Sequence, residues 1–268
     1  MHLDEKKPMP LVSVIMPAYN AARFVEQALD SVLAQTVSDL EIIVIDDGSV
    51  DNTREIISRY ARQDSRIRVL LNEENMGVAR TRNRGLELVT GRYVALLDSD
   101  DYWEPRMLEK MVARAEETGA DIIYCSYALV DEDGKKVCND FIVPAETTFE
   151  ESIVRSVITC STVLVTAELA KNNRFPTNMY HEDIALWFQI LRDGGTARGV
   201  PEVLAAYRQR ADSRSSGKMV SAMRRWTIYR RHLEMPLART VQVMFRYMYY
   251  GLKKYKRISA GAGEYANV

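Results

Sequence analysis

The sequence has few cysteines and no long uncharged segment. Its three cysteines, Cys125, Cys138 and Cys160, are odd in number and lack CxxC spacing, so neither a disulfide framework nor a zinc cluster is expected and we interpret them as packing residues. The longest uncharged run has 15 residues, Pro8 to Ala22, and prolines interrupt it, so no segment is predicted to cross a bilayer. The first seven residues have mixed charge and no apolar core, so we expect no secretory signal and a cytoplasmic location.

Two glycine-rich signatures are also missing. No G-x-G-x-x-G follows the first predicted strand, which disfavours a dehydrogenase. The loop there is Pro17-Ala18-Tyr19-Asn20, not the Gly-rich, Arg/Lys-bearing loop with which sugar-phosphate nucleotidyltransferases usually begin. The histidines, His2, His181 and His232, are too scattered to form a metal cluster themselves.

What is present is an ordinary globular composition with an uneven charge. The chain has 268 residues, 47% hydrophobic and 27% charged, which suits one large α/β domain or a domain with an appendage. Residues 1–217 carry 25 basic and 35 acidic side chains, whereas residues 218–257 carry 11 and 1. A basic segment confined to the C-terminus argues against a general nucleic-acid binder and for an anionic surface that meets this end.

The first 125 residues alternate apolar, β-branched runs with helical patterns. This alternation predicts an α/β fold with a mostly parallel sheet and helices on both faces. In such sheets ligands bind beyond the carboxyl ends of the strands, so the loops 17–20, 46–51 and 98–101 should face one site. Strands are predicted at 11–16, 40–45, 67–71, 93–97 and 121–125, and helices at 21–35, 52–64, 78–90 and 105–118.

The remainder of the chain has a looser pattern. Residues 126–217 predict a mixed α+β second half of the same domain, with a hairpin of 127–130 and 135–138 and helices at 149–157, 166–172 and 183–192. Residues 218–268 predict a basic helical extension of two helices broken near Pro236, with a disordered tail from Gly261.

The most informative loop is Asp98-Ser99-Asp100-Asp101, after the fourth predicted strand. If the strand geometry persists, Asp98 and Asp100 project to the same side and Ser99 to the other. Two close carboxylates are stable beside a cation, and Mg²⁺ or Mn²⁺ bridging to phosphate oxygens fits such ligands. The alternative is a capped turn before a helix that Pro105 begins.

Three further groups point to a nucleotide. Asp47 can accept from a pyrimidine N–H or from ribose hydroxyls, or belong to an Asx turn before a helix capped by Asp51. Tyr19 offers an aromatic face for a base, or packs on its neighbours. Arg80 and Arg82 cannot share one helix face, so one of them should enter the crevice and offset the charge of a nucleotide diphosphate.

In sequence order these blocks resemble the GT-A fold glycosyltransferases of family two, over about residues 10–105 and again near His181-Glu182-Asp183. The resemblance implies that Asp47 holds uracil, that Arg82 contacts the nucleotide, and that Asp98 and Asp100 bind ribose, metal and pyrophosphate. It also implies inverting transfer with Asp183 as the base; the alternative for Glu182 and Asp183 is to complement a helix dipole. We assign the other block positions, Pro17, Ala18, Asn75, Gly77 and Ser99, to the nucleotide-sugar site.

One position departs from the resemblance. Arg210 stands where many relatives have a histidine that can contact metal or phosphate. Arginine is not a metal ligand, so Arg210 either neutralises diphosphate charge directly or its loop does something else.

The last helix has an apolar stripe and a separate basic face. Arg239, Arg246 and Lys253 recur every seven residues, and the apolar stripe comprises Leu237, Val241, Met244, Phe245, Met248, Leu252 and Tyr255. This pattern suits an amphipathic helix on the anionic cytoplasmic face of an inner membrane. The alternative is an ordinary helix packed on the body or in a homo-oligomer.

The sequence therefore predicts an inverting, metal-dependent hexosyl- or N-acetylhexosaminyltransferase. Its donor would be a UDP-sugar and its acceptor a saccharide or lipid-linked saccharide in surface glycan biosynthesis. The non-enzymatic alternative is a sugar-nucleotide-binding scaffold, which Arg210 supports and which the intact Asp98, Asp100 and Asp183 contradict.

Overall fold

The computed structural model describes residues 9–209 and 218–259. Within these ranges nine strands form one sheet. The strands are β1 (Val12–Ala18), β2 (Leu40–Asp46), β3 (Ile67–Leu71), β4 (Tyr93–Leu96), β5 (Tyr102–Trp103), β6 (Ile122–Val130), β7 (Glu146–Thr147), β8 (Val163–Thr166) and β9 (Ala197–Arg208). The helices are α1 (Val25–Leu33), α2 (Thr53–Gln63), α3 (Val78–Leu86), α4 (Met107–Thr118), α5 (Phe149–Arg155), α6 (Ala167–Asn172), α7 (Glu182–Arg192), α8 (Lys218–Thr227) and α9 (Leu237–Ser259).

The sheet has the order β3-β2-β1-β4-β8-β6-β9-β5, and β7 pairs with β9. The pairs β1–β2, β1–β4, β2–β3 and β6–β9 are parallel, while β8, β5 and β7 pair antiparallel with their neighbours. The mostly parallel α/β sheet expected from the sequence is confirmed. The division drawn after residue 125 falls inside β6, so the two halves share a strand as well as the sheet.

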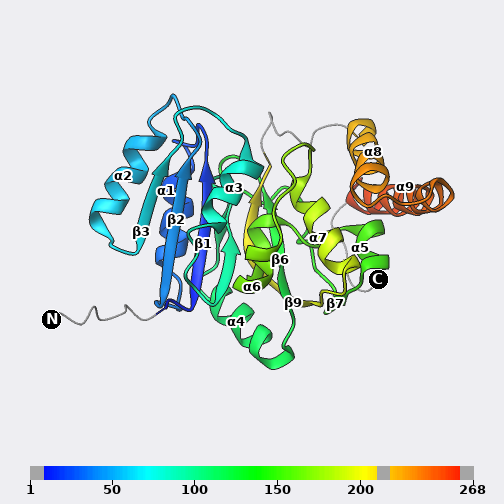
Figure 1. Cartoon of the computed structure of the whole chain (residues 1–268), viewed down its shortest axis with the longest axis horizontal. Coiled ribbons are helices and arrows are strands. Elements are labelled where there is room, and N and C mark those ends of the chain that lie inside the picture. Colours follow the sequence, from blue (N-terminus) through cyan, green and yellow to red (C-terminus); the bar gives the residue numbers. More distant parts are fainter. Residues whose placement is uncertain (1–8, 210–217, 260–268) are drawn as a thin grey trace.

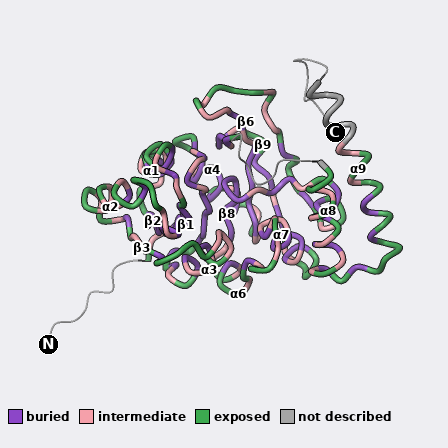
Figure 2. Tube along the Cα trace, turned by 90° about the horizontal axis from the view of Figure 1, so that it is seen from above, coloured by how far each residue is buried: buried purple, intermediate pink, exposed green. Residues whose placement is uncertain are grey.

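Alternating strand residues face two hydrophobic cores, one on each side of the sheet. On one side Val14 and Val44 pack with α1, α2 and α4, and on the other side Ile15 and Ile43 pack with α3, α6 and α7. Figure 1 shows the first βα units at one end of the molecule and α8 and α9 at the other. Figure 2 shows the strands buried between the surface helices. Two of the cysteines, Cys125 and Cys160, are buried in these cores as predicted.

The second half differs most from the sequence prediction. Residues 122–130 form one long strand instead of two, and the expected hairpin partner at 135–138 is reduced to a single bridge between Val130 and Lys136. Strands β8 and β9 were not predicted. In β9, Pro201 and Glu202 fall where the register with β6 shifts, so this bulge accommodates a proline that locally indicates a strand break.

A third, smaller core joins the C-terminal helices to the body. Val243 and Met244 of α9 pack with Ile153 of α5, Phe188 of α7 and Tyr229 in the π-helical segment Ile228–His232 that follows α8. Two helices broken near Pro236 are thus confirmed, while the tail from Gly261 lies outside the described residues. In the part of the chain that the structure describes, no helix has the length and apolar character needed to span a bilayer.

Candidate active site

One pocket of about 610 Å³ lies at the carboxyl ends of β1, β2 and β4, where the sequence places the site. All of the predicted site residues that the structure describes line this pocket; Arg210 lies outside the described residues. The start of α7, the end of β9 and one residue of α8 complete the wall. The lining residues are Pro17, Ala18, Tyr19, Asn20, Asp47, Asn75, Gly77, Val78, Arg82, Asp98, Ser99, Asp100, Asp101, Tyr180, His181, Glu182, Asp183, Tyr207, Arg208 and Arg224.

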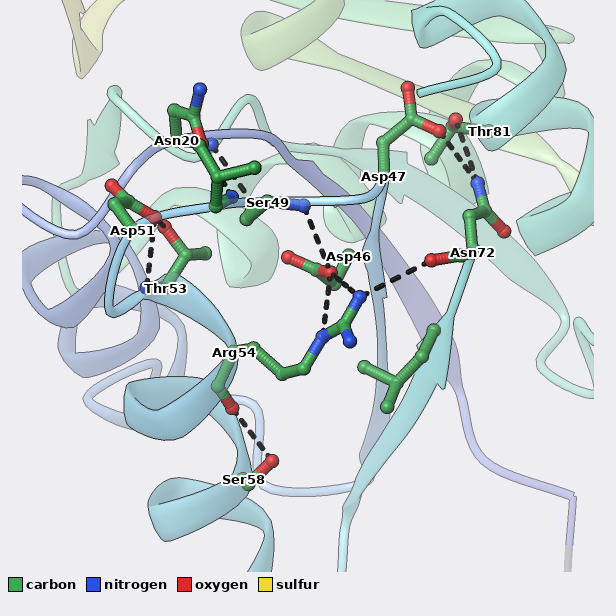
Figure 3. A network of polar contacts seen from close by, with 12 residues as sticks. Asn20, Asp46, Asp47, Ser49, Asp51, Thr53, Arg54, Ser58, Asn72 and Thr81 are labelled. Carbon is green, nitrogen blue, oxygen red and sulfur yellow. Dashed lines mark hydrogen bonds and ion pairs between the residues drawn. The ribbon is translucent and has the colours of Figure 1, made fainter. Parts of the chain in front are cut away.

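The two aspartates that end β2 have different surroundings (Figure 3). Asp46 is fully buried and points toward Arg54, whose Nη2 lies 2.9 Å from Asp46 Oδ2. The same oxygen accepts from the backbone N–H of Ser49 at 3.3 Å. Asp46 therefore holds α2 against the loop that follows β2, and it does not line the pocket.

Asp47 lines the pocket and also anchors the loop before α3. Its Oδ1 accepts from Asn72 Nδ2 at 2.7 Å and from the Met76 N–H at 2.9 Å, and its Oδ2 accepts from the Gly77 N–H at 3.0 Å. A carboxylate has about four acceptor positions. These three hydrogen bonds leave Asp47 with about one acceptor position for a ligand. A single pyrimidine N–H needs one such position.

Gly48 makes this arrangement possible. Its φ of +74° lies in the left-handed region, and a Cβ there would come within 2.6 Å of the Glu74 carbonyl carbon and 2.8 Å of the Asn75 nitrogen. Any other residue would push the Asn75-Met76-Gly77 loop away from Asp47. The Asx turn considered for this loop is also present, because Asp51 Oδ1 accepts from the Thr53 N–H at 3.0 Å; the helix N-cap itself is Asn52. The Asx turn is thus confirmed and the predicted helix cap at Asp51 is wrong, while the role of Asp47 toward a nucleotide stays a prediction.

Arg82 is the pocket arginine of the pair considered from sequence. It is 3% exposed, whereas Arg80 is on the exposed face of α3. Arg82 Nη2 lies 2.5 Å from Asp98 Oδ1, and Nη1 lies 2.7 Å from Glu182 Oε1. Burial alone would lower the pKa of Arg82, but the charges of Asp98 and Glu182 outweigh it and hold the pKa above the ordinary value. Arg82 thereby joins the loop after β4 to the start of α7.

The loop after β4 does not continue the strand. Strand β4 ends at Leu96, and Ser99 and Asp100 form a turn closed by the Asp101 N–H to the Asp98 carbonyl at 3.0 Å. The predicted alternation of side chains along a strand is therefore wrong. The turn nevertheless brings Asp98, Ser99 and Asp100 to the pocket wall.

Asp101 and Arg208 hold the backbone of this turn in place through hydrogen bonds. Asp101 is buried and accepts from Ser161 Oγ and from the Arg208 N–H, the latter at 2.7 Å. Arg208 Nε donates to the Asp100 carbonyl at 2.7 Å, and its Nη2 donates to Gln27 Oε1 at 2.6 Å. Burial, and then the charges of Asp100 and Asp98, raise the pKa of Asp101. The protein thus fixes the backbone of the turn while Asp98 and Asp100 face the pocket.

Asp183 lies in the first turn of α7, beside Glu182. Burial, and then the charge of Glu182, raise the pKa of Asp183 to about 6, although Arg82 acts in the opposite direction. A carboxylate with this pKa is a stronger base than an ordinary aspartate and is still mostly ionised near neutral pH. The helix-dipole interpretation is compatible with this role, because both acids stand at the helix N-terminus.

A metal ion would need the donor's phosphates as ligands here. In the described residues no group of three or more His, Cys, Asp or Glu side chains is placed to hold a metal. Mg²⁺ and Mn²⁺ sites in nucleotide enzymes commonly use one or two carboxylates together with phosphate oxygens and water. Asp98 and Asp100 on the pocket wall fit that smaller requirement.

Several pocket residues were not predicted from the sequence. Val78, Asp101 and Tyr180 lie near predicted site residues in the sequence, whereas Tyr207, Arg208 and Arg224 come from the end of β9 and from α8. Asp101 had a signal, since it completes an acidic run, and Tyr180 stands close to Glu182-Asp183. For Arg224 the sequence carries no signal beyond the positive charge of its segment, because only tertiary folding brings α8 to the pocket.

Comparison with known proteins places this architecture in a family. The family model "Glycosyl transferase family 2" matches residues 13–138. TuaG of Bacillus subtilis strain 168, named as a glycosyltransferase of teichuronic acid biosynthesis, is 39% identical over 82% of this chain and 88% of its own length. The Escherichia coli protein named UDP-Glc:alpha-D-GlcNAc-diphosphoundecaprenol beta-1,3-glucosyltransferase WfgD is 34% identical over 91% of this chain and 95% of its own.

The solved structures show the same fold. The crystal structure of S. aureus TarS residues 1–349 in complex with UDP-GlcNAc superposes with a TM-score of 0.69, at 21% identity, over 88% of this chain and 71% of that one. The four sequence blocks, the topology of the sheet and the similar proteins all indicate the same family and fold. The chain is a GT-A fold glycosyltransferase that belongs to glycosyltransferase family 2.

Proposed function

We propose that this protein transfers a hexose or N-acetylhexosamine from a UDP-sugar to a lipid-linked saccharide, with inversion at the anomeric carbon, during synthesis of a surface glycan. The observation that carries the proposal is the meeting, in one pocket, of Asp183 with the turn that bears Asp98 and Asp100. The names of TuaG and WfgD support surface glycan synthesis, and that of WfgD supports the donor and acceptor classes.

The donor would lie along the edge of the sheet. Tyr19 is 46% exposed at the pocket and offers a face for the uracil ring, while the remaining acceptor position of Asp47 would receive the uracil N–H. The diphosphate would reach Asp98 and Asp100, which would hold Mn²⁺ or Mg²⁺. That ion, when bound, neutralises charge on the departing diphosphate.

The transfer step needs one base. Asp183 would accept the proton of the acceptor hydroxyl as its oxygen attacks the anomeric carbon from the face opposite the diphosphate. The new C–O bond forms while the bond to the diphosphate breaks, and UDP leaves with that electron pair. Asp183 ends protonated, and the configuration at the anomeric carbon is inverted.

The direct experiment is a transfer assay with radiolabelled UDP-glucose, UDP-galactose, UDP-GlcNAc and UDP-GalNAc. The acceptors are undecaprenyl diphosphate sugars in membrane extract, and Mn²⁺ is present. We expect one donor to give a lipid-extractable labelled product with inverted anomeric configuration. Retention of configuration, or UDP-sugar binding without transfer or hydrolysis, would contradict the proposal; the second result would favour the scaffold.

The pH dependence of kcat/KM should report the raised pKa of Asp183. Because the base must be ionised, kcat/KM should rise with pH through a midpoint near 6 and level off above about pH 7. At pH 5 we expect about a tenth of the plateau value. Circular dichroism over the same pH range separates this change from unfolding, and a profile that is flat between pH 5 and 8 would remove Asp183 as the base.

We also propose that the enzyme works at the cytoplasmic face of the membrane, docked through α8 and α9. Of the 17 large apolar side chains exposed in the described residues, nine lie between Met219 and Tyr249, in a segment with strong positive charge. In the stripe predicted on α9, Met244 is buried against the body, whereas Leu237, Val241, Phe245 and Met248 are exposed. The helix therefore packs through one side and presents an apolar side, which suits an anionic bilayer.

Sedimentation with vesicles tests the docking. The wild type should co-sediment with vesicles of 30% phosphatidylglycerol and much less with pure phosphatidylcholine, and Phe245→Glu/Met248→Glu should weaken the binding about tenfold or more. Val137→Glu/Ile142→Glu, which changes two exposed apolar residues elsewhere, is the matched control. Equal sedimentation of both double variants would exclude this surface.

A further inference from the structure

Helix α8 of the basic C-terminal extension contributes directly to the pocket. Arg224 lines the same pocket as Asp183, and its guanidinium lies 4.3 Å from the centre of the Tyr180 ring. Tyr180 is 60% exposed and stands three residues before Asp183. An aromatic face fixes the plane of a guanidinium without neutralising its charge. The pair is therefore an oriented cation beside the proposed base.

This pair lies away from the loops that would hold uracil. The loops that would hold uracil follow β1 and β2 at one end of the sheet, whereas α7 and α8 lie toward the other end (Figure 1). The acceptor must bring its hydroxyl to Asp183. Groups that lie beside Asp183 on the α8 side are therefore placed to meet the acceptor rather than the uridine.

The charges of the pocket indicate what Arg224 would bind. The wall carries six acids against three arginines, of which Arg82 and Arg208 contact the turn after β4 and Arg224 lies on the α8 side. An acceptor with phosphate groups would be repelled from such a wall unless a cation met it. Arg224 supplies that cation on the acceptor side.

The opposite side of α8 is apolar. Met219, Met223 and Trp226 recur at helical spacing and are 79%, 65% and 38% exposed. One short helix thus presents a cation to the pocket and an apolar face to the surroundings. A molecule with a sugar, a diphosphate and a lipid chain in that order would match this arrangement: the sugar in the pocket, the diphosphate at the cation, and the lipid chain along the apolar face.

We propose that Arg224 and Tyr180 form an acceptor subsite that binds the diphosphate between the acceptor sugar and its lipid, with the lipid leaving past the apolar face of α8. This inference rests on the proposed function and extends it to the acceptor. It assigns the basic extension a role in substrate recognition in addition to membrane docking.

Titration calorimetry with decyl diphosphate tests the subsite without knowledge of the acceptor sugar. Saturating UDP and Mn²⁺ occupy the donor site, so decyl diphosphate reports a second diphosphate site. The wild type should bind it, and Arg224→Ala should weaken the binding about tenfold or more while UDP affinity changes less than twofold. Arg224→Lys should bind with intermediate affinity, because lysine keeps the charge but loses the planar fork.

Arg239→Ala is the matched control, since it removes the same charge from α9 at an exposed residue that does not line the pocket. The subsite is overturned if wild type does not bind decyl diphosphate beside UDP, if Arg239→Ala is as damaging as Arg224→Ala, or if Arg224→Ala weakens UDP equally. Wild type that fails to bind UDP at all would instead overturn the proposed function, and the subsite with it. Melting curves of each variant identify any loss that comes from misfolding.

Discussion

Asp183→Asn should lower kcat for sugar transfer by about 10³-fold, within the range of roughly 10² to 10⁴ expected for loss of a general base. Asparagine has nearly the shape of aspartate but cannot accept the acceptor's proton. The affinity for UDP-sugar should change less than twofold, because Asp183 belongs to the α7 side of the pocket and not to the loops at Asp47 and Asp98. Single-turnover transfer and calorimetry with UDP measure the two quantities separately.

The stability of this variant provides the control. Because the folded-state pKa of Asp183 is raised to about 6 from 3.8, the folded protein loses stability from this group as pH rises between those values. Above about pH 7 the buried charge of Asp183 is almost fully present, and asparagine removes it. Asp183→Asn should therefore melt no lower than wild type at pH 8. Transfer above a tenth of the wild-type rate would show that another group is the base.

Arg82→Met should destabilise the fold by about 3–5 kcal/mol, the usual effect of removing one partner from a buried ion pair. Methionine replaces the aliphatic stem but leaves Glu182 and Asp98 without their common cation. Arg82 is nearly fully buried and Glu182 is buried with it, so water compensates little of the loss. Urea unfolding at pH 7.5 measures the free energy of unfolding. We also expect kcat to fall, because Arg82 pairs with Glu182 and so holds the start of α7, where Asp183 lies.

Arg80→Met on the exposed side of α3 is the paired control, and should change stability by no more than about 0.5 kcal/mol. A loss below about 1 kcal/mol for Arg82→Met would mean that Asp98 and Glu182 find other partners. In that case Arg82 would not be the link between the turn after β4 and helix α7.

The first half of the fold was predictable because its signals are local. Apolar runs mark β1 to β4, and Gly119 ends α4 in the left-handed conformation that favours glycine. Helix α3 is the informative exception. It ends at Leu86, not near Thr90, and the Thr90 N–H and hydroxyl donate to Glu41 instead of continuing the helix. This contact joins residues 49 positions apart, so local spacing carries no trace of it.

The candidate site divides in the same way. Asp47, Asp98 and Asp183 were predictable because acids that follow strands or begin helices stand out in a sequence. The bond between Arg82 and Glu182 spans 100 residues, and the arrival of Arg224 at the pocket depends on how the last helices pack. Neither leaves a local pattern. The turn at Ser99 and Asp100 was only the alternative prediction, because strand alternation was extended past Leu97, whereas β4 ends at Leu96.

The proposed function depends most on Asp98 and Asp100, which we propose hold the diphosphate of the donor through a divalent ion. Calorimetric titration of UDP into wild type and Asp100→Ala, each with Mn²⁺ and with EDTA, tests this directly. We predict that Mn²⁺ tightens UDP binding to wild type about tenfold or more, and that Asp100→Ala removes most of this gain. Equal UDP affinity in all four titrations would show that these aspartates do not bind the diphosphate through a divalent ion.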